Sequence, residues 1–169
     1  SLTVMRIDVI ATAIRARMTV RDLAELDLAY APPYSSAKDP VNMADFVAGN
    51  VLDGMVRQYH WHDVPALSGR KDITMLDVRT RGEYARGRIA GTVNIPLDEL
   101  RSRLDELDRA KPAYVNCHSG LRSYIACRIL TAHGFDCYNL SGGYGFFRYA
   151  SAGAEYGGGQ TYPCGMPKE

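Results

Sequence analysis

The chain has 169 residues and a net charge of +1, with 46% hydrophobic and 23% charged residues. These values are typical of one ordinary globular domain with some length left over. A charge so close to zero argues against a nucleic-acid or anionic-membrane partner, because no field of one sign surrounds the chain. The sequence has neither a membrane-length apolar run nor a basic leader followed by an apolar stretch, so we expect a cytoplasmic protein.

The first fifty residues predict short helices. Isoleucines recur at helical spacing between residues 7 and 14, and Thr19 can cap a second short helix. Residues 31–38 are too rich in turn formers for either helix or strand, and Asp39 followed by proline predicts the start of a third helix. We expect these helices to bury little against one another, so their apolar faces should belong to a larger protein.

From about residue 56 the pattern changes to short strands that alternate with helices. Strands are predicted at residues 56–62, 73–78, 92–95, 113–116 and 135–140, with helical or amphipathic segments at 82–85, 97–107, 120–133 and 144–149. This alternation predicts an α/β fold with a five-stranded parallel sheet covered by helices on both faces. The helix at 120–133 is expected to bury a stripe of Leu121, Ile125 and Ile129.

Four cysteines are present, Cys117, Cys127, Cys137 and Cys164. In a chain expected in the cytoplasm, free or catalytic thiols are favoured over two disulfides, and the ten-residue spacing of the first three matches no zinc pattern. We interpret Cys127 and Cys137 as structural. Cys164 is either an exposed thiol or a resolving partner for Cys117.

The segment VNCHSGLRS, residues 115–123, places Cys117 where a parallel strand ends and a helix begins. A thiol there meets unpaired amides and the positive end of the helix dipole, which favour the thiolate. Arg122 would add to this effect if its side chain folds back over the loop. Ser119 and Gly120 allow a tight loop with inward-pointing N–H groups. The pattern therefore favours an activated sulfur nucleophile over a buried structural cysteine.

The spacing of this loop separates two chemistries. Cysteine phosphatases use C-x5-R, which wraps a phosphate, whereas Cys117 and Arg122 are spaced as C-x4-R. The smaller ring suits a single sulfur atom beyond the cysteine better than a tetrahedral phosphoryl group.

Four motifs in order make residues 70–148 resemble a rhodanese domain. They are LDVRTRGEY at 76–84, GRIAGTVNIP at 87–96, CHSGLRS at 117–123 and NLSGG at 139–143. There are two departures from the family pattern: Arg88 stands where histidine is usual, and Leu121 makes the loop less cationic than in rhodaneses that handle thiosulfate well. Thiosulfate is therefore expected to be a poor donor.

The resemblance implies a three-layer α/β/α domain over residues 51–152 and a sulfurtransferase mechanism. Cys117 would take the outer sulfur of a persulfide, polysulfide or thiosulfate donor, Arg122 would help stabilise the charge, and a thiol acceptor would remove the sulfur. The rest of the implied active-site loop consists of His118, Ser119, Gly120, Leu121 and Ser123. Asp77 and Arg79 would either brace this loop through hydrogen bonds or form an ordinary ion pair, and His118 would either tune the sulfur or face solvent.

The leading segment, residues 6–50, has a likeness of its own. DLAYAPPYSSAKDPVNM at 27–43 is similar to the end of the dimerisation domain in flavin-dependent pyridine-nucleotide disulfide oxidoreductases, especially CoA-disulfide reductases and NADH-dependent persulfide or polysulfide reductases with a C-terminal rhodanese domain. The likeness implies a remnant of that domain at residues 1–50. Residues 153–169 are rich in glycine and predict a flexible tail. The likeness also implies an upstream flavoprotein reductase domain and a full-length homodimer in which Tyr30 reaches the partner's active site.

No G-x-G-x-x-G follows a strand, so we expect no cofactor in this chain; FAD, NADH and CoA would belong to the full-length parent. Two alternatives stay open for the function, a non-catalytic docking or dimerisation module of rhodanese fold and, less favoured, a cysteine phosphatase or arsenate reductase. His60 and His62 would share one face of a strand, but without a third ligand in view we predict no metal site.

Overall fold

The computed structural model describes residues 2–28 and 39–156. The chain divides into two compact units, and the boundary along the sequence falls between Met55 and Val56. Predictions for residues 31–38, Tyr30 and Cys164 fall outside the described residues. The elements of the first unit are α1 (Leu2–Arg15), α2 (Val20–Ala24) and α3 (Pro40–Leu52). The second unit contains β1 (Arg57–Tyr59), η1 (Trp61–Asp63), α4 (Val64–Leu67), β2 (Thr74–Asp77), α5 (Arg81–Ala85), β3 (Val93–Asn94), α6 (Leu97–Leu100), η2 (Leu104–Glu106), β4 (Ala113–Asn116), α7 (Leu121–Ala132), β5 (Cys137–Leu140) and α8 (Gly143–Tyr156).

The helices of the first unit begin where the sequence places capping residues. The Thr19 side chain accepts from the Asp22 amide in a capping box at the start of α2, and Asp39 caps α3 with Pro40 in its first turn. As expected, much of the apolar surface stays exposed, for example 72% of Ile14 and 70% of Leu52. The resemblance of this unit to a reductase dimerisation domain stays a prediction.

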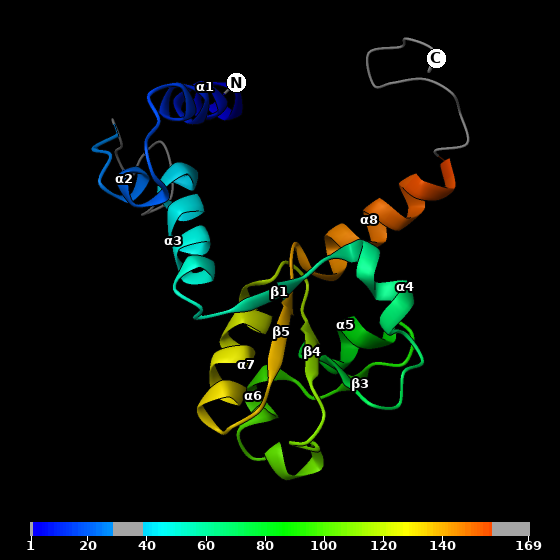
Figure 1. The fold of residues 1–169 in the computed structure, drawn as a ribbon. Helices are drawn as coiled ribbons and strands as arrows, with labels where there is room; N and C mark the ends of the chain where they lie inside the picture. The colour runs from blue at the N-terminus through cyan, green and yellow to red at the C-terminus, as the bar shows by residue number, and fades with distance from the viewer. Residues whose placement is uncertain (1, 29–38, 157–169) are drawn as a thin grey trace. The chain divides into compact units, whose positions relative to one another are not determined.

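The second unit is built on a five-stranded sheet with all strands parallel, in the order β1-β5-β4-β2-β3 (Figure 1). This is the predicted fold class. The registers pair Asp77 of β2 with Asn116 of β4, and Val115 of β4 with Asn139 of β5, so the carboxyl ends of the three central strands meet at one edge. Open parallel sheets place their ligands at this edge.

Two apolar layers cover the sheet, α6 and α7 on one face and α4, α5 and α8 on the other (Figure 1). Alternate residues of each strand point into opposite layers. Leu76 and Val115 pack on the α7 side, whereas Met75 and Tyr114 pack on the other. Each fully buried leucine contributes about 1.5–3 kcal/mol of transfer free energy, and Cys117 belongs to the core cluster on the α7 side.

The buried face of α7 differs from the predicted stripe. Leu121 is 65% exposed and Ile125 40% exposed, and of the three predicted residues Ile129 is the one in the core. The buried face instead contains Ser123, Ala126, Cys127, Ile129 and Leu130. Residues 121, 125 and 129 drift by only about 80° around the helix, so packing against the sheet, rather than the spacing of the residues, decides which stripe is buried.

Three further segments differ from the predictions. Residues 97–107 form α6 and η2 rather than one element, because Arg103 between them leaves the helical conformation (φ −126°). The strand predicted at 56–62 ends at Tyr59, where Asp63 accepts from the His60 amide and starts a 3₁₀ turn. The expected tail from residue 153 is helical as far as Tyr156, and its remainder, residues 157–169, lies outside the described residues.

Candidate active site

The Cys117 sulfur lies between the end of β4 and the start of α7, with two hydrogen-bond donors aimed at it. The Gly120 amide donates to Sγ at 3.1 Å, and the Ser123 hydroxyl lies 3.2 Å from both Sγ and the Gly120 carbonyl oxygen, so it can donate its one proton to either. Gly120 is the residue that caps α7, and its positive φ of 105° turns its N–H toward the sulfur. Both donors stabilise negative charge on sulfur more than they stabilise the neutral thiol.

The same side chain is fully buried, with 0% exposure. His118 and Ser119, the next two residues of the loop, are exposed. A donor can reach Sγ only after these loop residues shift. The structure therefore places a buried sulfur, with nearby hydrogen-bond donors, beneath two exposed loop residues.

Helix α8 holds the backbone of this loop from the other side. The Tyr144 amide donates to the Cys117 carbonyl at 2.7 Å, and the Gly145 amide donates to the His118 carbonyl at 2.9 Å. Gly143 makes the approach possible, because a Cβ atom there would lie 2.5 Å from the His118 carbonyl oxygen and 2.7 Å from the Ser119 nitrogen. Its φ of +64° also disfavours any side chain.

We expect Gly143→Ala to slow sulfur uptake by Cys117 and to lower the free energy of unfolding by about 1–3 kcal/mol, since the backbone atoms it meets cannot move cheaply. Gly134→Ala is the matched control, because Gly134 also has positive φ (+82°) but its Cβ would meet nothing within 4 Å. Both substitutions strain the backbone, but only the one at Gly143 also crowds the His118 and Ser119 backbone. Urea unfolding and sulfur-uptake rates, measured for both variants, therefore separate the effect of crowding from that of strain. Equal effects of the two substitutions would refute the role given to this close approach.

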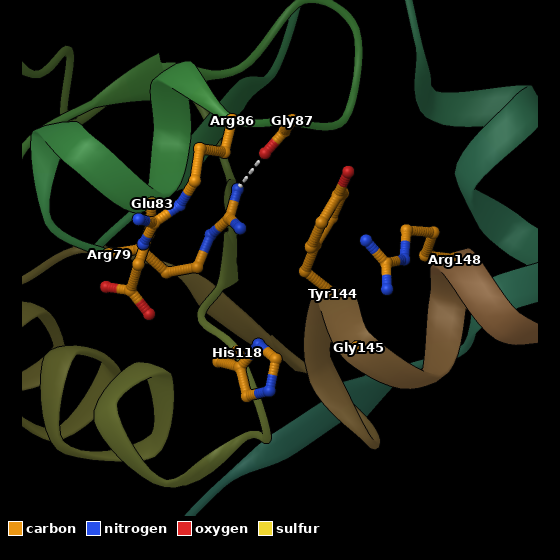
Figure 2. A pocket seen from close by; sticks show the side chains of 8 residues that line it. All are labelled: Arg79, Glu83, Arg86, Gly87, His118, Tyr144, Gly145 and Arg148. Atoms are coloured by element: carbon orange, nitrogen blue, oxygen red, sulfur yellow. Dashed lines mark hydrogen bonds between the residues drawn. The ribbon is translucent and has the colours of Figure 1, made fainter.

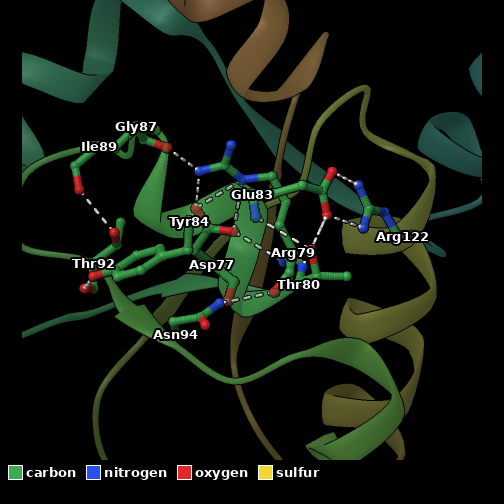
Figure 3. Close-up of polar contacts among 10 residues, drawn as sticks. All are labelled: Asp77, Arg79, Thr80, Glu83, Tyr84, Gly87, Ile89, Thr92, Asn94 and Arg122. Carbon is green, nitrogen blue, oxygen red and sulfur yellow. Dashed lines mark hydrogen bonds and ion pairs between the residues drawn. The ribbon is translucent and has the colours of Figure 1, made fainter.

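Among the described residues, the Arg122 side chain hydrogen-bonds with the Glu83 carboxylate rather than with the Cys117 sulfur. Its guanidinium forms two hydrogen bonds with the Glu83 carboxylate, at 2.8 and 2.7 Å, and Glu83 also accepts from Thr80 at the start of α5 (Figure 3). A bidentate carboxylate satisfies the planar guanidinium better than a single sulfur does. Arg122 therefore links the first turn of α7 to α5 through Glu83.

This pair lowers the pKa of Glu83 far below its usual value, first through the Arg122 hydrogen bonds and then through Thr80. A depressed carboxyl pKa gives stability that is present above the unfolded-state pKa and is lost as the pH falls toward the folded-state pKa. We expect Glu83→Gln to have a lower free energy of unfolding than wild type at about pH 7. The difference between the two free energies should become smaller below about pH 4. Urea unfolding at several pH values checks this, with the exposed Asp98→Asn as control; a gap independent of pH would contradict it.

Asp77 and Arg79 form a buried ion pair at the end of β2, with side-chain exposures of 0% and 3%. Arg79 Nη2 donates to Asp77 Oδ2 at 2.7 Å and to the Gly87 carbonyl at 2.7 Å (Figure 3). The Arg79 guanidinium also stacks on the Tyr144 ring at 4.1 Å. Since the Tyr144 amide binds the Cys117 carbonyl, the pair acts on the loop through Tyr144 rather than by bonding it directly.

A pocket of about 280 Å³ opens beside the loop (Figure 2). It is lined by Arg79, Glu83, Arg86, Gly87, His118, Tyr144, Gly145 and Arg148. His118 links it to the nucleophile's loop, which places this exposed histidine at a pocket wall. The sequence motifs contained Glu83, Gly87 and Gly143 without indicating their partners, and Arg86, Tyr144 and Arg148 were not singled out at all.

The other described cysteines have no part in this arrangement. Cys127 and Cys137 are buried, and Cys137 Sγ lies 3.2 Å from the Thr131 hydroxyl and donates to the Cys127 carbonyl at 3.3 Å. The hydrogen bond with the Cys137 thiol, together with burial, raises the pKa of Cys127. The hydrogen bonds of Cys137 with Cys127 and Thr131 lower the pKa of Cys137, so the structural interpretation of these two thiols stays a prediction.

Within residues 2–28 and 39–156, no cluster of three or more His, Cys, Asp or Glu side chains could hold a metal ion. His60 and His62 stack on each other, with ring centroids 5.5 Å apart. In the same described part of the chain, no helix has the length and hydrophobicity that a membrane crossing needs.

Comparison with known proteins agrees with the site geometry. The family model for the rhodanese-like domain matches residues 61–148, more than half of the chain. A sulfurtransferase of Allochromatium vinosum is 33% identical over 78 residues, which cover 46% of this chain and 73% of that protein. The cysteine loop and the pocket lie inside the matched family region.

Two solved structures match more of the chain. The crystal structure of reduced Bacillus anthracis CoADR-RHD is 47% identical with a TM-score of 0.80, over 85% of this chain and 26% of that one. A NAD-dependent persulfide reductase from A. fulgidus is 47% identical with a TM-score of 0.71, over 84% of this chain and 25% of that one. The chain thus spans about a quarter of each of these proteins.

Proposed function

Because the chain belongs to the rhodanese-like domain family, we propose that its second unit is a sulfurtransferase in which Cys117 carries a sulfane sulfur as a persulfide. The observation that carries the proposal is the convergence of the Gly120 amide and the Ser123 hydroxyl on Sγ at the ligand-binding edge of the sheet. The sulfurtransferase named among the relatives supports the same reaction class.

In the proposed reaction the Cys117 thiolate attacks the outer sulfur of a donor R–S–S⁻ or of thiosulfate. A new S–S bond forms at Cys117, the donor's S–S bond breaks, and RS⁻ or sulfite leaves with the bonding electron pair. An acceptor thiolate then attacks the outer sulfur and regenerates the Cys117 thiolate, so no external oxidant or reductant is needed. Gly120 and Ser123 can donate to Sγ, which has the negative charge before uptake and again after the outer sulfur has passed to the acceptor.

Two other functions fit less well. A docking module needs no thiol with two donors aimed at it. A cysteine phosphatase needs an arginine that closes over the phosphate, whereas Arg122 is engaged by Glu83. The loop length argues in the same direction.

For the full-length protein we propose a cytoplasmic, homodimeric flavoprotein reductase of CoA disulfides, persulfides or polysulfides, using FAD, NADH and CoA, with Tyr30 reaching the partner's active site. The support is the 47% identity to CoADR-RHD and to the persulfide reductase over most of this chain.

Mass spectrometry of the chain after incubation with polysulfide, glutathione persulfide or thiosulfate tests the proposal. We expect a gain of one sulfur atom on the peptide that contains Cys117, fast with persulfides and slow with thiosulfate. The absence of any adduct would favour the docking module, and hydrolysis of an aryl phosphate would favour the phosphatase.

A further inference from the structure

The pocket beside the cysteine loop has an excess of positive charge. Three of its lining residues are arginines and one is a glutamate. Arg79 is neutralised by Asp77, and Glu83 is neutralised by Arg122. Among the described residues no acidic side chain pairs with Arg86 or Arg148, so these two guanidinium groups leave the pocket with two positive charges. The whole chain has a net charge of only +1, so this concentration is local.

The two arginines approach the pocket from different elements. Arg86 follows α5, whereas Arg148 lies one turn into α8, beyond Tyr144 (Figure 2). Tyr144 forms a fixed wall between them: its ring packs under the Arg79 guanidinium, and its hydroxyl lies 2.6 Å from where a Cβ of Gly87 would be. The Arg79 and Tyr144 side of the pocket is therefore in place before a ligand arrives, whereas Arg86 and Arg148 are exposed and must become ordered on binding.

The size and place of the pocket indicate a ligand larger than a small inorganic anion. A volume of about 280 Å³ exceeds the share of about 30 Å³ that one water molecule takes in the liquid several-fold, so it has room for more than a small inorganic anion. His118 lines the pocket and Cys117 does not, although they are neighbours in the chain. A ligand whose charged end occupies the pocket can therefore bring its other end to the cysteine loop.

We propose that this pocket binds the anionic tail of the sulfur donor, and that Arg86 and Arg148 select organic persulfides whose tail carries a carboxylate or a phosphate. The proposal rests on the function proposed above and adds the class of donor. Guanidinium groups bind both kinds of oxyanion through paired N–H donors. The tail is held by charge while its sulfur end reaches the loop, so selection acts on binding rather than on the transfer step.

A binding experiment on the Cys117→Ser chain tests the pocket without turnover. The probes are 2-(methylthio)ethyl phosphate, S-methylglutathione and the uncharged 2-(methylthio)ethanol, followed by NMR through the amides of Gly87 and Gly145. We expect both anionic probes to shift these signals and the alcohol not to do so.

Arg86→Gln and Arg148→Gln should each weaken anion binding about 3- to 10-fold. Arg148→Lys should bind the anions more tightly than Arg148→Gln, and the exposed Arg101→Gln should bind them as wild type does. A phosphate probe that binds while S-methylglutathione does not would assign the pocket to phosphorylated tails, and the converse to carboxylates.

Sulfur uptake kinetics provide the second measurement. The preference for glutathione persulfide over 2-hydroxyethyl persulfide should fall about 3- to 10-fold in each glutamine variant, through KM rather than kcat, and should decline in high salt. Binding of the alcohol as tight as that of the anions, or glutamine variants that behave like wild type, would overturn the proposal. Wild-type chain that binds the anions through these arginines but takes up no sulfur would overturn the proposed function, leaving an anion site unconnected to sulfur transfer.

Discussion

A chain with Cys117 replaced by serine is expected to take up no sulfur from any donor that loads the wild type. The hydroxyl that replaces the thiol is a far weaker nucleophile and forms no persulfide, whereas the Gly120 and Ser123 donors stay in place. The loss should be complete by mass spectrometry rather than partial. The fold should survive, since one small buried side chain replaces another.

The buried thiols of Cys127 and Cys137 offer matched controls for this substitution. Cys127→Ser and Cys137→Ser should each lower stability somewhat, because a hydroxyl enters the core, while retaining one sulfur per chain after loading. Sulfur uptake that persists in Cys117→Ser, or disappears in a well-folded Cys137→Ser chain, would assign the chemistry to another thiol and would refute the mechanism.

The largest loss of stability is expected from Asp77→Ala. The Asp77 carboxylate accepts from the Arg79 amide and from its guanidinium, and both side chains are almost fully buried. Removing the carboxylate leaves a buried cation without its counter-charge, which costs about 3–5 kcal/mol. Urea unfolding at neutral pH measures the change, and sulfur uptake should fall as well, because Arg79 packs on Tyr144.

Two further variants separate charge burial from loss of packing. The double substitution Asp77→Ala with Arg79→Met should recover much of the stability lost by Asp77→Ala alone, since it removes the stranded charge. Asp72→Ala breaks the exposed ion pair with Arg70 and should unfold close to wild type. A double variant no more stable than Asp77→Ala would mean that the ion pair is not the source of the loss.

Much of the fold of the second unit could be predicted because its signals are local. The strand at Ala113–Asn116 is short, apolar and followed by turn residues, so both its type and its bounds could be read from the sequence. The buried face of α7 could not be predicted in the same way. Leu121 and Ile125 are apolar but exposed, whereas Ala126 and Leu130 are buried against β4 and β5. Tertiary packing decides between two stripes that the sequence offers almost equally.

The candidate site divides in the same way. The position of Cys117 and the inward amide of Gly120 follow from a strand, a turn and a helix in succession, which sequence displays directly. The partner of Arg122 could not be predicted in this way, because Glu83 is 39 residues away in the sequence and the fold of the sheet brings the two together. Arg86 and Arg148 meet at the pocket for the same reason, from elements that share no motif.

The hydrogen bonds between α8 and the cysteine loop also limit which insertions the connection between β5 and α8 can accept. The amides of Tyr144 and Gly145 reach the loop carbonyls because Ser141 and Gly142 join β5 to the helix by the shortest of connections. One residue inserted in α8 before Tyr144 would turn the rest of the helix by about 100° and move those amides off their acceptors. The length of this connection is thus as much a requirement for a usable sulfur as the identity of the nucleophile, and natural variation should preserve it.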